Sequence, residues 1–343
     1  MQNDNPGNDR LVGRLLSIIN ILLLVIGVLV VAIIAMPFIL EQNKQVINPS
    51  PVAQNAITNA DTTAYWTPAD INAISDSNLK KKIEYGKELV IHTSKYFGPK
   101  GTILHINQGM NCQNCHLQAG TAVYGNNFGS VASLYPKFKA RSGAVETIYK
   151  KVNDCFERSM NGKPIDTVSK EMQAIVAYIN YIGSNVPKET KAAGSGLRDI
   201  VYLDRPADPM KGQVVYATIC QTCHQADGAG LLNTDSTGFT YPPLWGDKSF
   251  NDGASLFRIA SFAKYIKVNM PQGTTYKSPV LTDEQAWDVA AFVVSQPRTH
   301  IDTRKDWPDI SLKPVDQPLG PYTDTFPEKQ HKHLKELHCR DHF

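Results

Sequence analysis

Two short cysteine motifs are the clearest chemical feature of this 343-residue sequence. They read CQNCH at positions 112–116 and CQTCH at positions 220–224, and they contain four of the six cysteines. Two thiols three residues apart can form thioethers with the two vinyl groups of one porphyrin, and the adjacent histidine can bind its iron. The pattern predicts two covalently bound haem c groups, one attached through Cys112 and Cys115 with proximal ligand His116, the other through Cys220 and Cys223 with proximal ligand His224.

Zinc and thiol redox sites explain these motifs less well. Zinc would require the two cysteine pairs to converge on one ion, and a thioredoxin-like site gives no role to the histidine after each pair.

The composition also excludes some classes of partner. Charged residues make up 20% of the chain and the net charge is +3, so nothing favours binding to nucleic acid.

The sixth iron ligand determines the redox potential of a haem and its openness to substrate. In the second half of the chain, Met270 lies in a loop with Pro271 and Gly273 that precedes a predicted helix. A thioether in such a loop can reach the iron, so we expect Met270 as the distal ligand. A methionine that only fills a gap in the core is the alternative.

The distal ligand of the first haem follows from aligning the two halves. When Ala177 is matched to Ala291, an offset of 114 residues, Met270 corresponds to position 156, next to Cys155. We therefore expect Cys155 as this ligand and as the catalytic residue. Met160 is the competing ligand, and a buried inert thiol or a disulfide with Cys339 is the structural alternative.

Different distal ligands imply haems of different potential. A thiolate ligand pushes electron density onto the iron, whereas a methionine ligand raises its reduction potential. The first haem should therefore have the lower reduction potential and the second haem the higher one. A cysteine sulfur beside iron can also bond reversibly to a sulfur atom of a substrate. Hydrogen-bond donors near Cys155 suit a doubly charged oxyanion, although they could equally form a solvated basic face: Lys137, Lys139, Arg141, Arg158, Ser159 and Lys163.

The elements that hold these residues occur in the same order twice: a helix, a haem motif, a long loop and a closing helix. The helices are expected from Tyr85, over 168–182, from Met210 into the second motif, and over 283–294 with Thr282 as N-cap. No stretch alternates with period two, so the fold class is all-α, with two tandem cytochrome c domains. The expected segments are a cytoplasmic N-terminus at 1–14, a transmembrane anchor at 15–40, a tether at 41–75, domain 1 at 76–187, a linker at 188–208, domain 2 at 209–298 and a Pro- and His-rich tail at 299–343.

A membrane anchor is expected because Leu15 to Leu40 contains no ionisable residue and exceeds the roughly 20 residues of a spanning helix. Arg10 and Arg14 before it place the N-terminus in the cytoplasm. The catalytic domains are then expected on the periplasmic side of the cytoplasmic membrane. A signal peptide and a buried core helix are the alternatives. In the tail, His331, His333, His338, Cys339 and His342 suggest either a metal site or a solvated polar end.

The sequence resembles the dihaem thiosulfate dehydrogenases. The resemblance lies in the cysteine loop at 153–164, the motif at Cys112 and the run Asn269-Met270-Pro271. The resemblance covers about 85–297. It implies reversible coupling of two thiosulfates to tetrathionate with release of two electrons, with Cys155 carrying a covalent sulfur adduct and Arg141 and Ser159 binding substrate. Some members have lysine where this chain has Asn269. Its absence implies methionine ligation in both oxidation states, and members with asparagine there can act as tetrathionate reductases.

Other functions fit the same motifs. A dihaem electron carrier, such as a membrane-anchored terminal oxidase subunit, should have methionine as distal ligand in both domains. A protein of the SoxA type, which joins thiosulfate to a carrier protein, would need a partner subunit. A peroxidase is disfavoured by two filled sixth positions. The expected partners are thiosulfate or tetrathionate, the membrane through the N-terminal helix, and a redox partner such as a cytochrome c, another carrier or a membrane oxidase.

Overall fold

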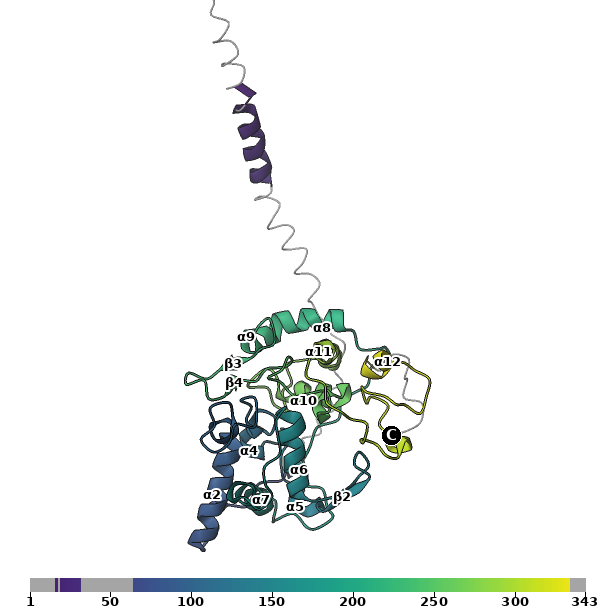
Figure 1. The fold of residues 1–343 in the computed structure, drawn as a ribbon. Helices are drawn as coiled ribbons and strands as arrows, with labels where there is room; N and C mark the ends of the chain where they lie inside the picture. Colours follow the sequence, from purple (N-terminus) through teal and green to yellow (C-terminus); the bar gives the residue numbers. More distant parts are fainter. Residues whose placement is uncertain (1–15, 18, 32–63, 334–343) are drawn as a thin grey trace, which may run out of the picture. The chain divides into compact units, whose positions relative to one another are not determined.

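The computed structural model describes residues 16–17, 19–31 and 64–333 of the chain (Figure 1). The chain divides into two compact units, 1–62 and 63–343. The described residues of the first unit are helical. Both haem motifs belong to the second unit, in which two helical domains follow one another along the chain.

The transmembrane anchor predicted at 15–40 is not borne out. No helix within the described residues has the length and apolar character needed to cross a membrane. The predicted location in the cytoplasmic membrane, with the catalytic domains on its periplasmic side, is therefore wrong. The remaining positions of the predicted anchor lie outside the described residues.

Domain 1 is built around two helices that pack against each other, α2 and α7. Asp76 caps α2, accepting hydrogen bonds from the backbone N–H groups of Asn78 and Leu79, and Ser169 caps α7 through Met172 N–H. The helical elements are η2 (Ile71–Ala73), α2 (Ser77–Ile91), α3 (Thr93–Phe97), η3 (Cys112–Asn114), α4 (Leu117–Gly120), α5 (Val131–Leu134), α6 (Ile148–Asp154), the π-helical turn η4 (Cys155–Ser159) and α7 (Lys170–Ile182).

Domain 2 repeats the plan with α8 and α11 as the packed pair. Thr282 caps α11 through a capping box with Gln285, which confirms the predicted N-cap. The helix at Met210 runs into the second motif through a π-helical turn. The helical elements of this domain are α8 (Pro209–Val215), η5 (Tyr216–Cys220), α9 (Gln221–His224), η6 (Ser255–Phe257), α10 (Ile259–Asn269) and α11 (Asp283–Ser295), and the tail adds η7 (Ile310–Leu312) and α12 (Glu328–His333).

The structure is rich in helices, but two small antiparallel sheets depart from the all-α prediction. Strand β1 (Lys137–Lys139) pairs with β2 (Ala144–Glu146), and β3 (Leu231–Leu232) pairs with β4 (Phe239–Tyr241). Each strand has two or three residues, which is too short to show a period-two pattern in the sequence. The β1–β2 hairpin lies just before α6, so it belongs to the surroundings of Cys155.

Equivalent glycines allow both helix pairs to cross closely. A Cβ atom on Gly86 of α2 would lie 2.0 Å from the carbonyl oxygen of Ala174 in α7. A Cβ atom on Gly212 of α8 would lie 1.9 Å from the carbonyl oxygen of Asp288 in α11. Ala174 and Asp288 are 114 residues apart, which is the offset that the sequence predicts between the closing helices. The two domains therefore share one helix crossing in one register.

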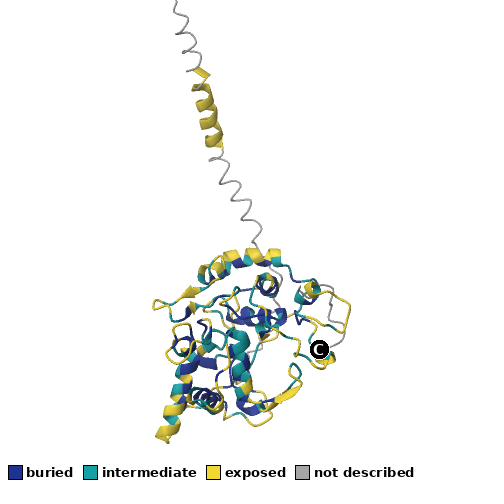
Figure 2. Ribbon diagram, in the orientation of Figure 1, coloured by how far each residue is buried: buried dark blue, intermediate teal, exposed yellow. Residues whose placement is uncertain are grey.

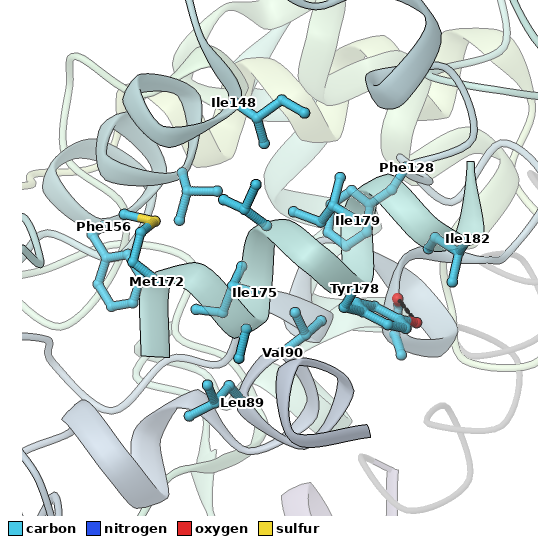
Figure 3. Close-up of a cluster of buried hydrophobic side chains, with 14 of the residues drawn as sticks. Leu89, Val90, Phe128, Ile148, Phe156, Met172, Ile175, Tyr178, Ile179 and Ile182 are labelled. Atoms are coloured by element: carbon cyan, nitrogen blue, oxygen red, sulfur yellow. Dashed lines mark hydrogen bonds between the residues drawn. The ribbon is translucent and has the colours of Figure 1, made fainter. Parts of the chain in front are cut away.

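Each domain has its own apolar core, and the burial pattern shows buried faces turned inward on the packed helices (Figure 2). In domain 1 the buried side chains of α7 meet those of α2 (Figure 3), and Tyr178 donates a hydrogen bond of 2.8 Å to the carbonyl oxygen of Ala119 beside the first haem motif. Phe156, next to Cys155, is fully buried and packs edge to face on Phe97. The core thus reaches from the helix crossing to the cysteine loop.

The described part of the tail contacts the rest of the second unit. Trp307 N–H donates to the carbonyl oxygen of Arg141, so the tail contacts the β1–β2 hairpin of domain 1. His331 is buried, stacks on Tyr322 with ring centroids 3.5 Å apart, and interacts with Asp324. No group of three possible metal ligands occurs within 16–17, 19–31 and 64–333. His338, Cys339 and His342 lie outside the described residues, as does the side chain of His333.

Candidate functional site

The first haem motif forms a tight turn that is hydrogen-bonded to the start of α3. Thr93 accepts a hydrogen bond from Cys112 N–H at 3.0 Å and donates one to its sulfur at 3.2 Å. Asn111 and Asn114 close the turn with reciprocal hydrogen bonds. Burial raises the pKa of the thiols of Cys112 and Cys115 to about 12, because the site is shielded from water.

Both motif histidines are oriented for metal binding through Nε2. Nδ1 of His116 lies 2.5 Å from the carbonyl oxygen of Asn126, and Nδ1 of His224 lies 2.8 Å from that of Pro242. A carbonyl can only accept, so Nδ1 carries the hydrogen and Nε2 keeps its lone pair. Burial lowers the pKa of His116 to about 4 and also lowers that of His224. Both imidazoles are therefore neutral, which is the form that binds iron.

The second motif opens into a large cavity. The cavity has a volume of about 890 Å³ and is lined by Cys220, Cys223, His224 and Met270. Met270 follows the last residue of α10, in the loop that the sequence predicts. Thr274 lines the same cavity, and its buried hydroxyl oxygen has no hydrogen-bond partner in the described part of the chain. Thiols, a neutral histidine, a thioether and a free hydroxyl around one cavity fit a haem c.

The cavity extends to the first motif, since Asn114 and Cys115 also line it. At this place two hydrogen bonds join the domains. Tyr265 of α10 donates to the carbonyl oxygen of Asn114 at 3.2 Å, and Asn269 donates to that of Tyr124 at 3.1 Å. The two haem motifs therefore face one shared space, an arrangement suited to electron transfer between two haems.

Cys155 begins the π-helical turn that extends α6. A negative charge on Cys155 contributes to raising the pKa of Cys112 and of Cys115, after the larger effect of burial, so its sulfur lies close to the first motif. Met160, the competing ligand, is 3% exposed and belongs to the apolar core of domain 1. None of the described cysteines, Cys155 among them, forms a disulfide.

Cationic groups surround this turn, although the two arginines already have partners. Arg141 donates to Asp154 at 3.2 Å, and Arg158 forms two hydrogen bonds with Asp306, of 2.6 and 2.8 Å. Both arginines also point a nitrogen at the carbonyl oxygen of Gly253, at 3.4 and 3.3 Å. Ser159 ends the turn and is partly exposed.

Lys151 is a cation near the site that the sequence prediction missed. Its charge lowers the pKa of His116 after the effect of burial, and it also lowers the pKa of the half-buried Lys139. Lys151 precedes Cys155 by four residues, which is about one helical turn. A helix over 148–155 therefore places Lys151 and Cys155 on the same face. The charges of Lys139 and Lys151 therefore lie near each other, and that of Lys151 acts on the motif histidine. Lys163 is exposed.

Comparisons with known proteins agree with two cytochrome c domains. Residues 105–187 match the family described as SoxA/TsdA, cytochrome c domain, and residues 207–293 match the family described as Cytochrome C oxidase, cbb3-type, subunit III. The domain limits predicted from the sequence remain predictions.

Curated relatives cover most of the chain. A thiosulfate dehydrogenase of Psychrobacter arcticus is 35% identical over 243 residues, which are 70% of this chain and 71% of that protein. One of Allochromatium vinosum is 36% identical over 197 residues, which are 56% of this chain and 71% of that protein. One of Thiomonas intermedia is 33% identical, covering 69% of this chain and 72% of that protein.

A solved structure is similar as well. It is the as-isolated form of a thiosulfate dehydrogenase (TsdBA) from Marichromatium purpuratum, with a TM-score of 0.62 and 28% identity. The match covers 68% of this chain and 49% of that one, so the present chain spans about half of its length. Together with the cavity and the two histidines, these similarities establish two covalently bound haem c groups as the cofactors.

Proposed function

The chain belongs to the thiosulfate dehydrogenase family of cytochrome c oxidoreductases, and on this premise we propose that it interconverts thiosulfate and tetrathionate at Cys155. The observation that carries the proposal is the position of Cys155, in a turn close enough to the first haem motif for its charge to act on Cys112, with the cation Lys151 four residues before it and Lys139 within electrostatic reach of Lys151. Thiosulfate carries two negative charges, so such an environment favours its approach.

The reaction is proposed to proceed through a sulfur adduct of Cys155. The thiolate of Cys155 and the terminal sulfur of thiosulfate form an S–S bond, and two electrons leave. The terminal sulfur of a second thiosulfate then attacks the sulfane sulfur of this adduct, the atom bonded to the sulfur of Cys155, and the S–S bond to Cys155 breaks. That step releases tetrathionate and regenerates the thiolate, and the reverse sequence reduces tetrathionate. When bound, the two haems supply one-electron acceptors for the two electrons.

The ligand assignments belong to the same proposal. His116 and Cys155 bind the first iron, and His224 and Met270 bind the second, while Cys112, Cys115, Cys220 and Cys223 attach the porphyrins. The hydrogen bonds from Nδ1 of the two histidines support their part of it, because they leave Nε2 free. The cavity supports Met270, which lines it together with His224. Thiolate ligation would make the first haem the lower in potential.

Arg141 and Ser159 are proposed to bind the sulfonate oxygens of the substrate. Arg141 donates one hydrogen bond to Asp154, and a second nitrogen makes a longer contact of 3.4 Å with the carbonyl oxygen of Gly253. Its remaining N–H groups can still donate to a substrate. A guanidinium has five N–H donors, so one ion pair does not exhaust it. The hydroxyl of Ser159 lies four residues after Cys155 in the same turn. We expect the electrons to pass to a cytochrome c, another carrier or a membrane oxidase.

The test is thiosulfate-dependent reduction of ferricyanide by the haem-loaded protein, with the reverse assay on tetrathionate. Cys155→Ala should lose more than about 10³-fold in turnover while both haems remain attached. Met160→Leu is the matched control, since it removes the other sulfur of this loop, and it should keep most of the activity. A parent protein inactive in both directions, whose haems nevertheless reduce normally, would instead indicate an electron carrier.

A further inference from the structure

The turn that carries Cys155 is held in place by residues of domain 2. Asn251 is fully buried; its side-chain amide donates to the carbonyl oxygen of Glu157 at 2.8 Å, and its backbone N–H donates to that of Arg158 at 3.1 Å. The last carbonyls of a helix lack partners within the helix, so these contacts satisfy them. Asn161, just after the turn, donates to Thr299 and to the carbonyl oxygen of Asp247, both at 2.8 Å.

A charged pair adds a contact from the tail. Arg158 and Asp306 form a two-pronged ion pair, with nitrogen–oxygen distances of 2.6 and 2.8 Å, although the residues are 148 positions apart. The side chains are only 16% and 12% exposed. Burial alone would lower the pKa of Arg158, and the hydrogen bonds with Asp306 outweigh that effect and raise it. The pair is therefore well formed and largely shielded from water.

The tail around Asp306 is fixed on both sides. On the domain 2 side, Asp252 accepts hydrogen bonds from the side chain of His300 at 2.6 Å and from Ile301 N–H at 3.0 Å. On the domain 1 side, Trp307 N–H donates to the carbonyl oxygen of Arg141 at 2.7 Å. Asp306 therefore presents its carboxylate to Arg158 from an anchored backbone.

We propose that Asp306 is a positioning residue for the distal ligand: through Arg158 it fixes the π-helical turn so that the Cys155 sulfur stays directed at the first haem. The inference rests on the proposed function, in which Cys155 binds that iron. A π-helical turn is a rare, irregular conformation that depends on its surroundings. Arg158 lies three residues after Cys155 in this turn, so a shift of its guanidinium moves the backbone that carries the sulfur.

The test compares Asp306→Asn with Asp302→Asn in the haem-loaded full-length protein. Asp302 is a suitable control because it pairs with Arg304 inside the tail and is 56% exposed. Optical and electron paramagnetic resonance spectra of the first haem provide the readout, with Cys155→Ala as the reference for a lost ligand. In Asp306→Asn, part of the first haem should acquire the Cys155→Ala spectrum, while the second haem stays unchanged.

Turnover should follow the spectrum. Loss of an outer partner of a metal ligand typically costs about 10- to 100-fold, so kcat of Asp306→Asn should fall by that factor with a smaller change in KM. Asp306→Glu keeps the carboxylate and should restore much of the parent spectrum, which a general loss of stability would not explain. Asp302→Asn should keep the first-haem spectrum and the kcat of the parent.

The outcomes separate this inference from the proposed function. A parent-like spectrum and kcat in Asp306→Asn, beside a changed Cys155→Ala, would overturn the positioning role and leave Cys155 as the ligand. An unchanged first-haem spectrum in Cys155→Ala would overturn the ligand assignment, and the positioning role with it. If Asp306→Asn fails to fold, the double variant Arg158→Met/Asp306→Leu removes both charges and tests the same contact, with the same spectra expected.

Discussion

Arg141 of the β1–β2 hairpin donates a hydrogen bond of 3.2 Å to Asp154, the residue immediately before Cys155. Asp154 is 4% exposed at its side chain and also pairs with Lys150. One nearly buried carboxylate thus joins the hairpin to the end of α6. The hairpin is therefore part of the structure that supports the cysteine as well as a source of cations.

Replacing Arg141 by glutamine should affect both stability and substrate affinity. Asp154 would keep Lys150 and lose one charged hydrogen bond, so the free energy of unfolding should fall by about 1–3 kcal/mol. The KM for thiosulfate should also rise, because we propose that Arg141 binds a substrate oxygen. Chemical denaturation and steady-state assays measure the two effects. Lys137→Gln, an exposed change on the same hairpin, is the control; an unchanged KM in Arg141→Gln would leave Arg141 a purely structural role.

Met270→His should lower the potential of the second haem without changing that of the first, because methionine ligation raises the potential relative to histidine. Thiosulfate oxidation should then slow more than tetrathionate reduction, since the second haem becomes a weaker acceptor. A spectroelectrochemical titration that resolves the two haems makes the measurement. Met210→Leu, at a side chain that is 70% exposed, should leave both potentials unchanged. A shift confined to the first haem would contradict the assignment of Met270.

Gly86→Ala should destabilise domain 1. The added Cβ would lie 2.0 Å from the carbonyl oxygen of Ala174, so α2 and α7 must move apart, at a cost of at least about 1–3 kcal/mol. Gly212→Ala should have the corresponding effect in domain 2. Denaturant unfolding of the haem-loaded protein gives the free energies, and Lys87→Ala, an exposed change in α2, is the control. Equal midpoints for Gly86→Ala and the parent would mean that the helices can separate freely.

Stability should depend on pH through His300. Its pKa is raised above 6.5 by the hydrogen bond and charge of Asp252, with further contributions from Asp302 and Glu328. A group whose folded pKa is raised stabilises the protein fully below its unfolded pKa, and this contribution disappears as the pH rises through the folded pKa. The unfolding midpoint of the parent should therefore decline above about pH 6.5. His300→Gln should remove this part of the decline; identical pH profiles would show that the pair contributes nothing.

The repeated plan of the molecule could be predicted because it depends on local patterns. The motif at Cys112 has a fixed spacing, the cap at Thr282 is a local hydrogen-bond pattern, and the offset of 114 residues is repeated in the two glycine crossings. The membrane anchor was predicted from apolar composition alone, and no helix in the described part of the chain is long and apolar enough to cross a membrane. The strands of the β1–β2 hairpin were missed because three residues are too few to establish a period.

The support of the cysteine loop could not be predicted. Asn251, Thr299 and Asp306 are about 90 to 150 residues away from the turn that they contact. The prolines of the tail exclude long helices, but they do not show that an irregular segment packs against another domain. Only the tertiary fold brings these residues to Cys155, whereas Lys151 could have been found from its helical spacing.

The contacts of Asn251 have a consequence for how this protein can be divided. Its side chain completes the hydrogen bonding of a turn that belongs to the other domain. If domain 1 were produced alone, or fused to a different cytochrome, the carbonyl oxygens of Glu157 and Arg158 would face water. The turn that carries Cys155 would then lack the hydrogen bonds that hold its conformation. The two cytochrome domains are thus not interchangeable modules: domain 2 supplies hydrogen bonds that complete the Cys155 turn of domain 1, and the two should be engineered as a pair.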